Sequence, residues 1–309
     1  MRLTYESGSR NVALNPIAET FERLRWTADL SQQTWIDLLG IHWWQYHRIK
    51  AGLEPIPDHV IERVAQHFHI TPHELITGNL DFGEIAATIH KGSNLPERYT
   101  KAAYGRKRTT ITSIEFLEMF YGWRLKLDVL KTHNVTEADL RDPFAPISMQ
   151  FITDICAYLH DHRQFRAQDF LAMGAYSYLA NRKTLVGQIL SEMRSPFELY
   201  DFFFNEAMKL FERNCRYTIS KRRDRGITLE ILSHPDVAAE SGVRHLGNAY
   251  ICHLKAGVFA TLTRYIGLPN AFIRKTSCVH RGDSICRYEC DFPHPRQGEV
   301  NPPASRLLH

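Results

Sequence analysis

The sequence predicts two domains, an all-α domain of five short helices followed by an α+β domain. At roughly 100–200 residues per domain, the 309 residues are enough for two. Apolar residues recur at helical spacing over residues 1–80, and later segments mix helical with strand-like patterns. The composition, 44% hydrophobic and 23% charged, is typical of a globular protein and excludes collagen-like, low-complexity and wholly disordered chains.

Helix start and stop signals divide the first domain, residues 1–80, into its five helices. Ser31 is a good N-cap and Gly40 a stop, and Thr71-Pro72 places a cap before a proline at the first helical position. Asp58 can cap a helix whose apolar residues follow at helical spacing. The expected helices cover residues 17–26, 31–39, 41–50 and 58–68, with the fifth beginning at residue 71.

Residues 81–113 are expected to form a basic linker between the domains. From Lys91 to Arg108 the chain has six Lys or Arg residues and one acid, Glu97, and the apolar periodicity fades. Beyond it, residues 114–292 regain a core, with helices expected at 114–130, 151–159, 196–215 and 249–266, and strands at 227–232 and 286–292. The Pro-rich tail, residues 293–309, is expected to be disordered.

Membrane and secretion signals are not evident in the sequence. The longest apolar stretch, residues 250–272, is interrupted by His253, Lys255 and Arg264, so no membrane span is expected. The N-terminus has no apolar signal-peptide core, which leads us to expect a cytoplasmic protein. In a reducing compartment its six cysteines would be core residues, metal ligands or redox thiols.

Catalytic motifs are also missing from the sequence, so we do not expect an enzyme. The chain contains no Gly-rich phosphate loop, GxSxG, HExxH or kinase signature. The polar run His160-Asp161-His162 is interpreted as an exposed helix end, because no further ligands follow it at set distances.

Residues 30–52 predict two helices joined by a short turn at Gly40-Ile41, which is the supersecondary unit known as helix-turn-helix. Ile41, Tyr46 and Ile49 would face the core. The second helix would then present its other side chains outward, free to enter a major groove about 12 Å wide.

This segment resembles the phage-repressor-like (Cro-type, Xre) helix-turn-helix family over residues 17–80. The resemblance rests on Leu30-Ser31-Gln32, on Leu39-Gly40-Ile41 and on the run from Arg48 to Gly52. His42-Trp43-Trp44 departs from the small polar residues usual at the start of the third helix. The resemblance implies binding to double-stranded DNA, with Gln32 at a phosphate and the other candidates near bases or backbone: Gln33, His42, Trp43, Trp44, Gln45, His47 and Arg48.

The charge of the first domain leaves an alternative open. Residues 1–80 contain seven Lys or Arg and nine Asp or Glu, a net charge of −2, whereas DNA-binding domains are usually basic. The third helix has no acid, and the basic linker could supply phosphate contacts. The alternative is an adaptor that does not bind DNA and engages a protein partner through Trp43 and Trp44.

A second motif combines Cys278 and Cys286, separated by seven residues around a Gly-containing turn, with Cys252 further upstream. Thiols at the two ends of a turn can approach one ion, and tetrahedral zinc takes four Cys, His or carboxylate ligands. Zinc, thiols buried in the core and a redox switch are all compatible with this pattern.

The same residues resemble the 4-vinyl reductase domain and the related sensor domain of aromatic-responsive bacterial activators, most strongly over residues 196–292. The resemblance implies a 4-vinyl-reductase-like α+β sensor domain with zinc on Cys252, Cys278 and Cys286. Lys275 stands where the family has a Glu ligand, so a fourth ligand would have to come from His280 or Cys290.

That resemblance also implies a preformed pocket for a small apolar or aromatic effector. The candidate lining residues are Tyr200, Phe203, Phe204, Met208, Phe211, Tyr250 and Phe259. The combined expectation is a transcriptional regulator that binds DNA as a homodimer and senses a small molecule. A tetrapyrrole-binding accessory protein of the 4-vinyl reductase type is a further alternative. The sequence does not identify the effector, the operator or the direction of regulation.

Overall fold

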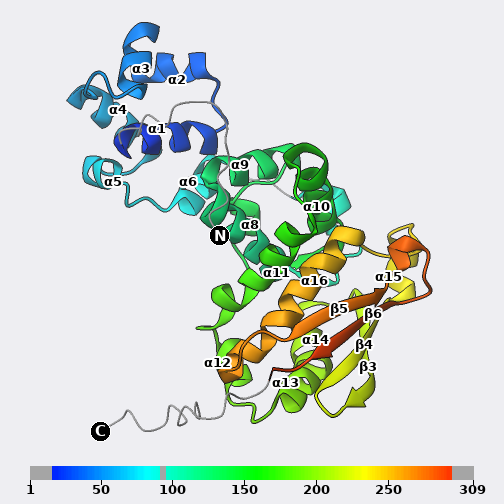
Figure 1. Cartoon of the computed structure of the whole chain (residues 1–309). Helices are drawn as coiled ribbons and strands as arrows, with labels where there is room; N and C mark the ends of the chain where they lie inside the picture. The colour runs from blue at the N-terminus through cyan, green and yellow to red at the C-terminus, as the bar shows by residue number, and fades with distance from the viewer. Residues whose placement is uncertain (1–15, 91–94, 294–309) are drawn as a thin grey trace, which may run out of the picture. The chain divides into compact units, whose positions relative to one another are not determined.

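The computed structural model describes residues 16–90 and 95–293 (Figure 1). The chain divides into two compact units, and the boundary falls after Ser93, with the short segment Thr136–Ala138 assigned to the first unit. Apart from Pro293, the predicted tail at residues 293–309 lies outside the described residues. In the part of the chain that is described, no helix is long and apolar enough to cross a membrane.

The described part of the N-terminal unit is helical. Its first five helices coincide closely with the expected ranges, and a sixth follows them: α1 (Pro16–Thr27), α2 (Gln32–Leu39), α3 (Trp43–Lys50), α4 (Asp58–Phe68), α5 (Pro72–Thr77) and α6 (Phe82–Ile89). Their apolar faces meet around Trp35, which is fully buried and packs its ring against Phe21 and Phe68.

The turn between α2 and α3 depends on two local signals. Ser31 Oγ accepts the backbone N–H of Thr34 at 3.1 Å, so the first turn of α2 is capped as expected. Gly40 ends α2 in the left-handed conformation, with φ of 65°, and its N–H bonds back to the carbonyls of Ile36 and Asp37. A side chain at this position would be strained, which is why glycine ends the helix here.

The C-terminal unit combines helices with an antiparallel sheet, and the predicted α+β class is confirmed for it. Its helical elements are α7 (Glu97–Thr100), α8 (Lys107–Tyr121), α9 (Trp123–Thr132), η1 (Ala138–Leu140, whose first residue belongs to the N-terminal unit), α10 (Met149–Arg163), α11 (Ala167–Asn181), α12 (Leu185–Ser191), α13 (Pro196–Phe202), the π-helical η2 (Phe203–Ala207), α14 (Met208–Phe211), α15 (Pro235–Glu240), α16 (Ala249–Thr261), η3 (Leu262–Ile266) and η4 (Val279–Arg281).

The strands of this unit form two sheets. A short pair is made by β1 (Gly105–Arg106) and β2 (Pro146–Ile147), and a four-stranded antiparallel sheet has the order β3-β4-β6-β5, with β3 (Cys215–Arg223), β4 (Gly226–Ser233), β5 (Phe272–Ser277) and β6 (Cys286–Asp291). Helix α16 contacts β5 and β6 and also packs along α11 (Figure 1). The helix α16 therefore joins the sheet to the helical layer.

Several expected boundaries differ from the structure. Residues 81–113, expected as a linker, contain α6, α7, β1 and the start of α8. The single helix expected at 114–130 is divided at Gly122, whose φ of 87° breaks the helical path. The helix expected at 196–215 changes to a π-helical turn at Phe203 before α14 ends at Phe211.

The backbones of α11 and α16 approach each other closely at two glycines. A Cβ placed on Gly257 would lie 1.9 Å from the carbonyl oxygen of Leu171, and one on Gly174 would lie 1.9 Å from that of Leu254. No side chain fits in either position without moving a helix backbone. Two glycines, one on each helix, therefore set the distance between α11 and α16.

We predict that Gly257→Ala destabilises the C-terminal unit. Alanine in a helix interior normally stabilises by about 0.5–1 kcal/mol over glycine, but overpacking a close contact costs about 1–3 kcal/mol or more. The free energy of unfolding, measured in urea, should therefore fall. Gly83→Ala in α6 is the control, because its added Cβ meets a side-chain oxygen of Asp81 at 3.2 Å and no backbone. Equal effects of the two substitutions would contradict this packing.

Candidate functional site

Helix α3 exposes aromatic and basic side chains at the surface of the N-terminal unit. Trp43 is 66% exposed and Trp44 48%, and His47 and Arg48 are exposed as well. Tyr46 and Ile49 face the core, as expected, while Ile41 is half-buried. None of the eight residues of α3 is acidic.

A buried carboxylate anchors α3 to α1. Glu22 of α1 is nearly fully buried and accepts hydrogen bonds from the Tyr46 hydroxyl, from Lys50 Nζ at 3.1 Å and from Arg25 at 3.3 Å. Burial raises the pKa of Glu22, but the hydrogen bond from Tyr46 and the charge of Lys50 outweigh it, so that pKa lies below its ordinary value. Glu22 is therefore ionised at neutral pH and fixes the orientation of α3.

The remaining predicted DNA contacts surround this helix. Gln32 Nε2 lies 3.2 Å from His47 Nε2, which links the start of α2 to α3, and Gln33 donates to Asp37 within α2. The rings of His42 and Trp44 stack at 6.3 Å.

One acid lies beside this surface. Glu54 accepts hydrogen bonds from Gln45 at 3.2 Å and from Arg48 Nε at 3.1 Å. The structure thus places the eight predicted residues on and around α2 and α3. Because Arg48 is paired with Glu54, DNA would have to compete with this carboxylate for Arg48.

A cavity of about 170 Å³, partly open to solvent, lies in the C-terminal unit, among α8, α10, α11, α14 and α16. Its wall is mostly apolar, and α16 contributes Ile251, Leu254, Val258 and Phe259. Of the predicted lining residues, Phe203, Met208, Phe211 and Phe259 do face it.

The other three predicted lining residues belong to the packed interior. Tyr200 is fully buried and donates to the Phe259 carbonyl at 2.6 Å, and Phe204 stacks on Tyr217. Tyr250 stacks on His160 and Phe170. Their aromatic spacing reflects core packing rather than a ligand site.

The cavity has a polar side that the sequence analysis missed. Lys255 Nζ lies 3.2 Å from Glu212, and the Tyr217 hydroxyl donates to the same carboxylate at 2.7 Å. Burial lowers the pKa of Lys255, but the neighbouring acidic groups of Cys215 and Glu212 raise it above the ordinary value overall. A lysine inside the mostly apolar residues 249–261 was the signal that could have identified this site.

Asn214 also lines the cavity, and it contains an unsatisfied acceptor. Asn214 is 2% exposed, and its backbone carbonyl accepts the N–H of His234 at 2.8 Å. Among the described residues, its side-chain Oδ1 has no hydrogen-bond partner. Leaving a buried acceptor unpaired costs about 1–3 kcal/mol, which a donor on a bound molecule would recover.

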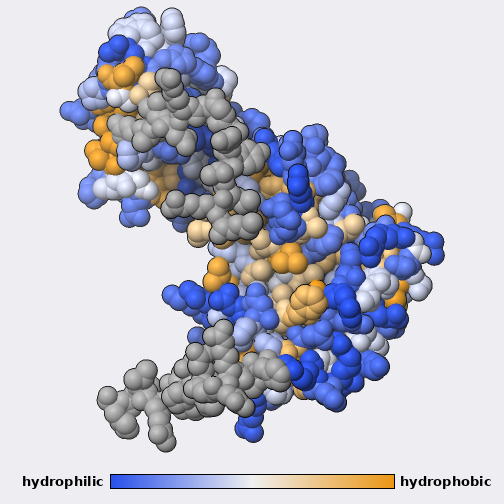
Figure 2. Space-filling view, in the orientation of Figure 1, coloured by the Kyte–Doolittle hydropathy of each residue, from blue (hydrophilic) through white to orange (hydrophobic). Residues whose placement is uncertain are grey.

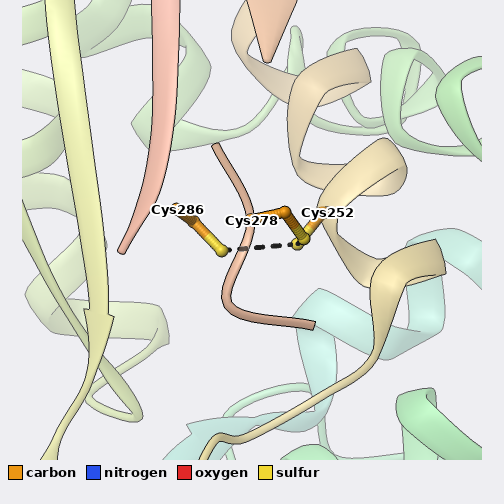
Figure 3. A group of neighbouring side chains, drawn as sticks. All are labelled: Cys252, Cys278 and Cys286. Carbon is orange, nitrogen blue, oxygen red and sulfur yellow. Dashed lines mark hydrogen bonds between the residues drawn. The ribbon is translucent and has the colours of Figure 1, made fainter. Parts of the chain in front are cut away.

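Three thiols meet between α16 and the sheet, as Figure 3 shows. Cys252 Sγ lies 3.8 Å from Cys278 Sγ and 3.7 Å from Cys286 Sγ, and all three side chains are buried. The hydrogen bond from Cys286 lowers the pKa of Cys252 against the effect of burial, and the same hydrogen bond raises the pKa of Cys286. Lys275 Nζ lies 3.4 Å from Cys278 Sγ.

Comparisons with known proteins give a structural likeness only. No family model and no curated protein matches the sequence. Among solved structures, the unliganded Fe(II) H-NOX protein from K. algicida matches 62% of this chain and 98% of its own, at 8% identity and a TM-score of 0.46. An Fe(II)NO H-NOX protein from S. oneidensis matches 61% of this chain and 99% of its own, at 10% identity and a TM-score of 0.46.

An oxygen-binding H-NOX domain related to soluble guanylate cyclases gives a third match, over 61% of this chain and 96% of its own, at 12% identity and a TM-score of 0.45. Likeness at this level assigns no ligand to the present chain. The expected resemblance to the 4-vinyl reductase domain is wrong, because these matches are H-NOX domains. The expected phage-repressor-like resemblance is not supported either, since no family model matches the sequence.

The zinc prediction is also wrong. The cysteine cluster provides three of the four ligands that zinc requires. Within residues 16–90 and 95–293, the group of mutually close ligand atoms includes neither His280 nor Cys290, although the His280 side chain hydrogen-bonds Cys252. The ammonium of Lys275 lies beside the thiols where the resemblance implied a carboxylate.

Haem does not fit the cavity either. Iron in haem takes an axial His, Cys, Met or Tyr ligand, and of these residue types only Met and Tyr line this cavity. Its volume of about 170 Å³ is below the roughly 300–1,000 Å³ of pockets for drug-sized ligands, so a macrocycle is too large for it. The size also argues against the tetrapyrrole alternative.

We predict that Glu22→Gln destabilises the N-terminal unit at pH 7 by about 1.5–3 kcal/mol, the range for hydrogen bonds to charged groups. Because the folded-state pKa of Glu22 is lowered, its stabilisation exists above the unfolded pKa of about 4.3 and is lost as the pH falls through the folded value.

Thermal melts of the parent protein and of Glu22→Gln between pH 7 and pH 3 test this prediction. The Tm of Glu22→Gln should lie below that of the parent protein at pH 7, and the gap should narrow toward low pH. Glu62→Gln, at an exposed position on α4, is the control and should melt like the parent protein throughout. A Tm difference between Glu22→Gln and the parent protein that stays constant with pH would contradict an ionised Glu22.

Proposed function

We propose that this protein is a regulator rather than an enzyme, and that its N-terminal unit binds double-stranded DNA through α3. The observation that carries the proposal is the exposed face of α3, where Trp43, Trp44 and Arg48 project from a helix that contains no acid. The short turn at Gly40 makes α2 and α3 a helix-turn-helix unit in this proposal.

The chemistry of this face suits duplex DNA. An α-helix fits the major groove, where Arg recognises guanine and apolar side chains contact the thymine methyl group. Gln32 is exposed in the first turn of α2, where side chains and backbone N–H groups commonly meet phosphate. One such unit per chain makes a homodimer on two half-sites the simplest assembly.

A protein-binding adaptor is the second candidate function. It is favoured by the net charge of −2 over residues 1–80 and by the ion pairs of Arg48 with Glu54 and of Lys50 with Glu22. DNA binding would require Arg48 to exchange its carboxylate partner for the DNA.

Electrophoretic mobility against a pool of genomic duplex fragments separates these candidates. We expect retention at 50 mM salt that weakens steeply at 200 mM, because phosphate neutralisation releases counterions. Arg48→Ala should weaken binding by about 1–3 kcal/mol. Gln66→Ala, at an exposed position on α4, should have no effect. No retention at low salt would favour the adaptor and overturn the proposal.

For the C-terminal unit we propose the binding of a small, uncharged and mainly apolar molecule in the cavity. The apolar wall supports this choice, and the charge of Lys255 is already balanced by Glu212. The free acceptor of Asn214 favours a ligand with one hydroxyl or N–H donor.

Benzyl alcohol and benzyl methyl ether test this ligand class, since they differ in the donor. A ligand that binds the folded state raises Tm, so the alcohol should raise it more than the ether does. Asn214→Leu should remove that difference, while Ser177→Ala, another lining position, should keep it. Equal shifts by both compounds in the parent protein would contradict a donor-selective cavity.

A further inference from the structure

We propose that the three-cysteine cluster is a peroxide-reactive site, in which Cys252 forms a disulfide with Cys278 or Cys286. Cys252 is the shared partner, since its sulfur lies 3.8 Å from one and 3.7 Å from the other. All three cysteines are free thiols, and Figure 3 shows their side chains converging from different elements.

The fold allows these sulfurs to meet. A disulfide has an S–S distance of about 2.05 Å, so each pair must approach by less than about 2 Å. Cys278 and Cys286 flank a turn whose residues 281–284 are exposed, while Cys252 is held in α16. The exposed turn can adjust more easily than the buried helix.

Hydrogen peroxide, or another two-electron hydroperoxide, supplies the oxidising equivalents. The Cys252 thiolate attacks one peroxide oxygen, so that the O–O bond breaks, an S–O bond forms and hydroxide leaves. The thiolate of Cys278 or Cys286 then attacks the sulfenic sulfur, so that the S–S bond forms and the S–O bond breaks, releasing a second hydroxide. The two thiol protons convert both hydroxides to water.

The other cysteines lack this arrangement. Cys156 is fully buried, and burial raises its pKa. The sulfur of Cys215 lies 3.4 Å from Lys255 Nζ. Of the six cysteines, only Cys252, Cys278 and Cys286 form a group whose sulfur atoms lie within 4.8 Å of one another in the described structure. Proximity therefore selects the cluster as the site of disulfide formation.

The disulfide would also affect the cavity. Ile251, next to Cys252 in α16, lines its wall, so a bond from Cys252 to the turn or to β6 restrains the helix that forms this wall. This consequence rests on the proposed ligand binding, but the thiol reaction does not, so each can fail without the other.

The test treats the full-length reduced protein with a small excess of hydrogen peroxide, with a chelator present to suppress metal-catalysed oxidation. Intact-mass spectrometry and thiol counting should show the loss of two hydrogen atoms and two thiols. Peptide mapping should find Cys252 in the disulfide. Cys286→Ser should divert the bond to Cys278, and Cys252→Ser should lower disulfide yield about ten-fold or more.

Cys156→Ala is the matched control and should react like the parent protein. Circular dichroism of each variant establishes that it is folded before treatment. Since Cys286→Ser retains one reactive pair, it keeps the proposal testable even if Cys252→Ser does not fold. Six thiols left after treatment, a disulfide without Cys252, or oxidation that stops at single sulfonic acids would each overturn the proposal.

Discussion

The backbone contact between α11 and α16 is the constraint on which the C-terminal unit depends. Gly174 and Gly257 leave no room for a side chain between the helices, so the position of α16 is set by backbone atoms. Lys255 then reaches the cavity and Cys252 meets the two thiols near the sheet. One buried helix thus supplies both the wall of the ligand cavity and the central member of the thiol cluster.

In the N-terminal unit, the packing of α3 leaves aromatic side chains exposed. Tyr46 and Ile49 bury one face of α3, and the ionised Glu22 fixes that face through Tyr46 and Lys50. Trp43 and Trp44 consequently stay in solvent, where exposed apolar groups usually mark an interaction surface. In the C-terminal unit, Figure 2 shows hydrophobic residues gathered over α11 and α16.

Local signals made much of the fold predictable, while features that depend on tertiary packing were missed. Ser31, Gly40 and Thr71 gave correct helix ends because caps and turns act within a few residues. Helix α11 was missed since its apolar residues surround it, and β3 and β5 were missed because charged residues such as Lys221 and Lys275 interrupt their apolar pattern. The cysteine spacing brought the right thiols together, yet Asn214 and Glu212 join the cavity only through the fold. Aromatic residues such as Tyr200 were assigned to the pocket because helical spacing alone does not separate a core from a cavity.

Hydrogen exchange of the full-length protein, with and without a pool of duplex DNA, tests the central claim most directly. If α3 binds the major groove, amides at the start of α2 and along α3 should gain protection that disappears at high salt. Protection confined to the C-terminal unit, or no change at low salt with excess DNA, would contradict the assignment of α3 as the DNA-binding helix.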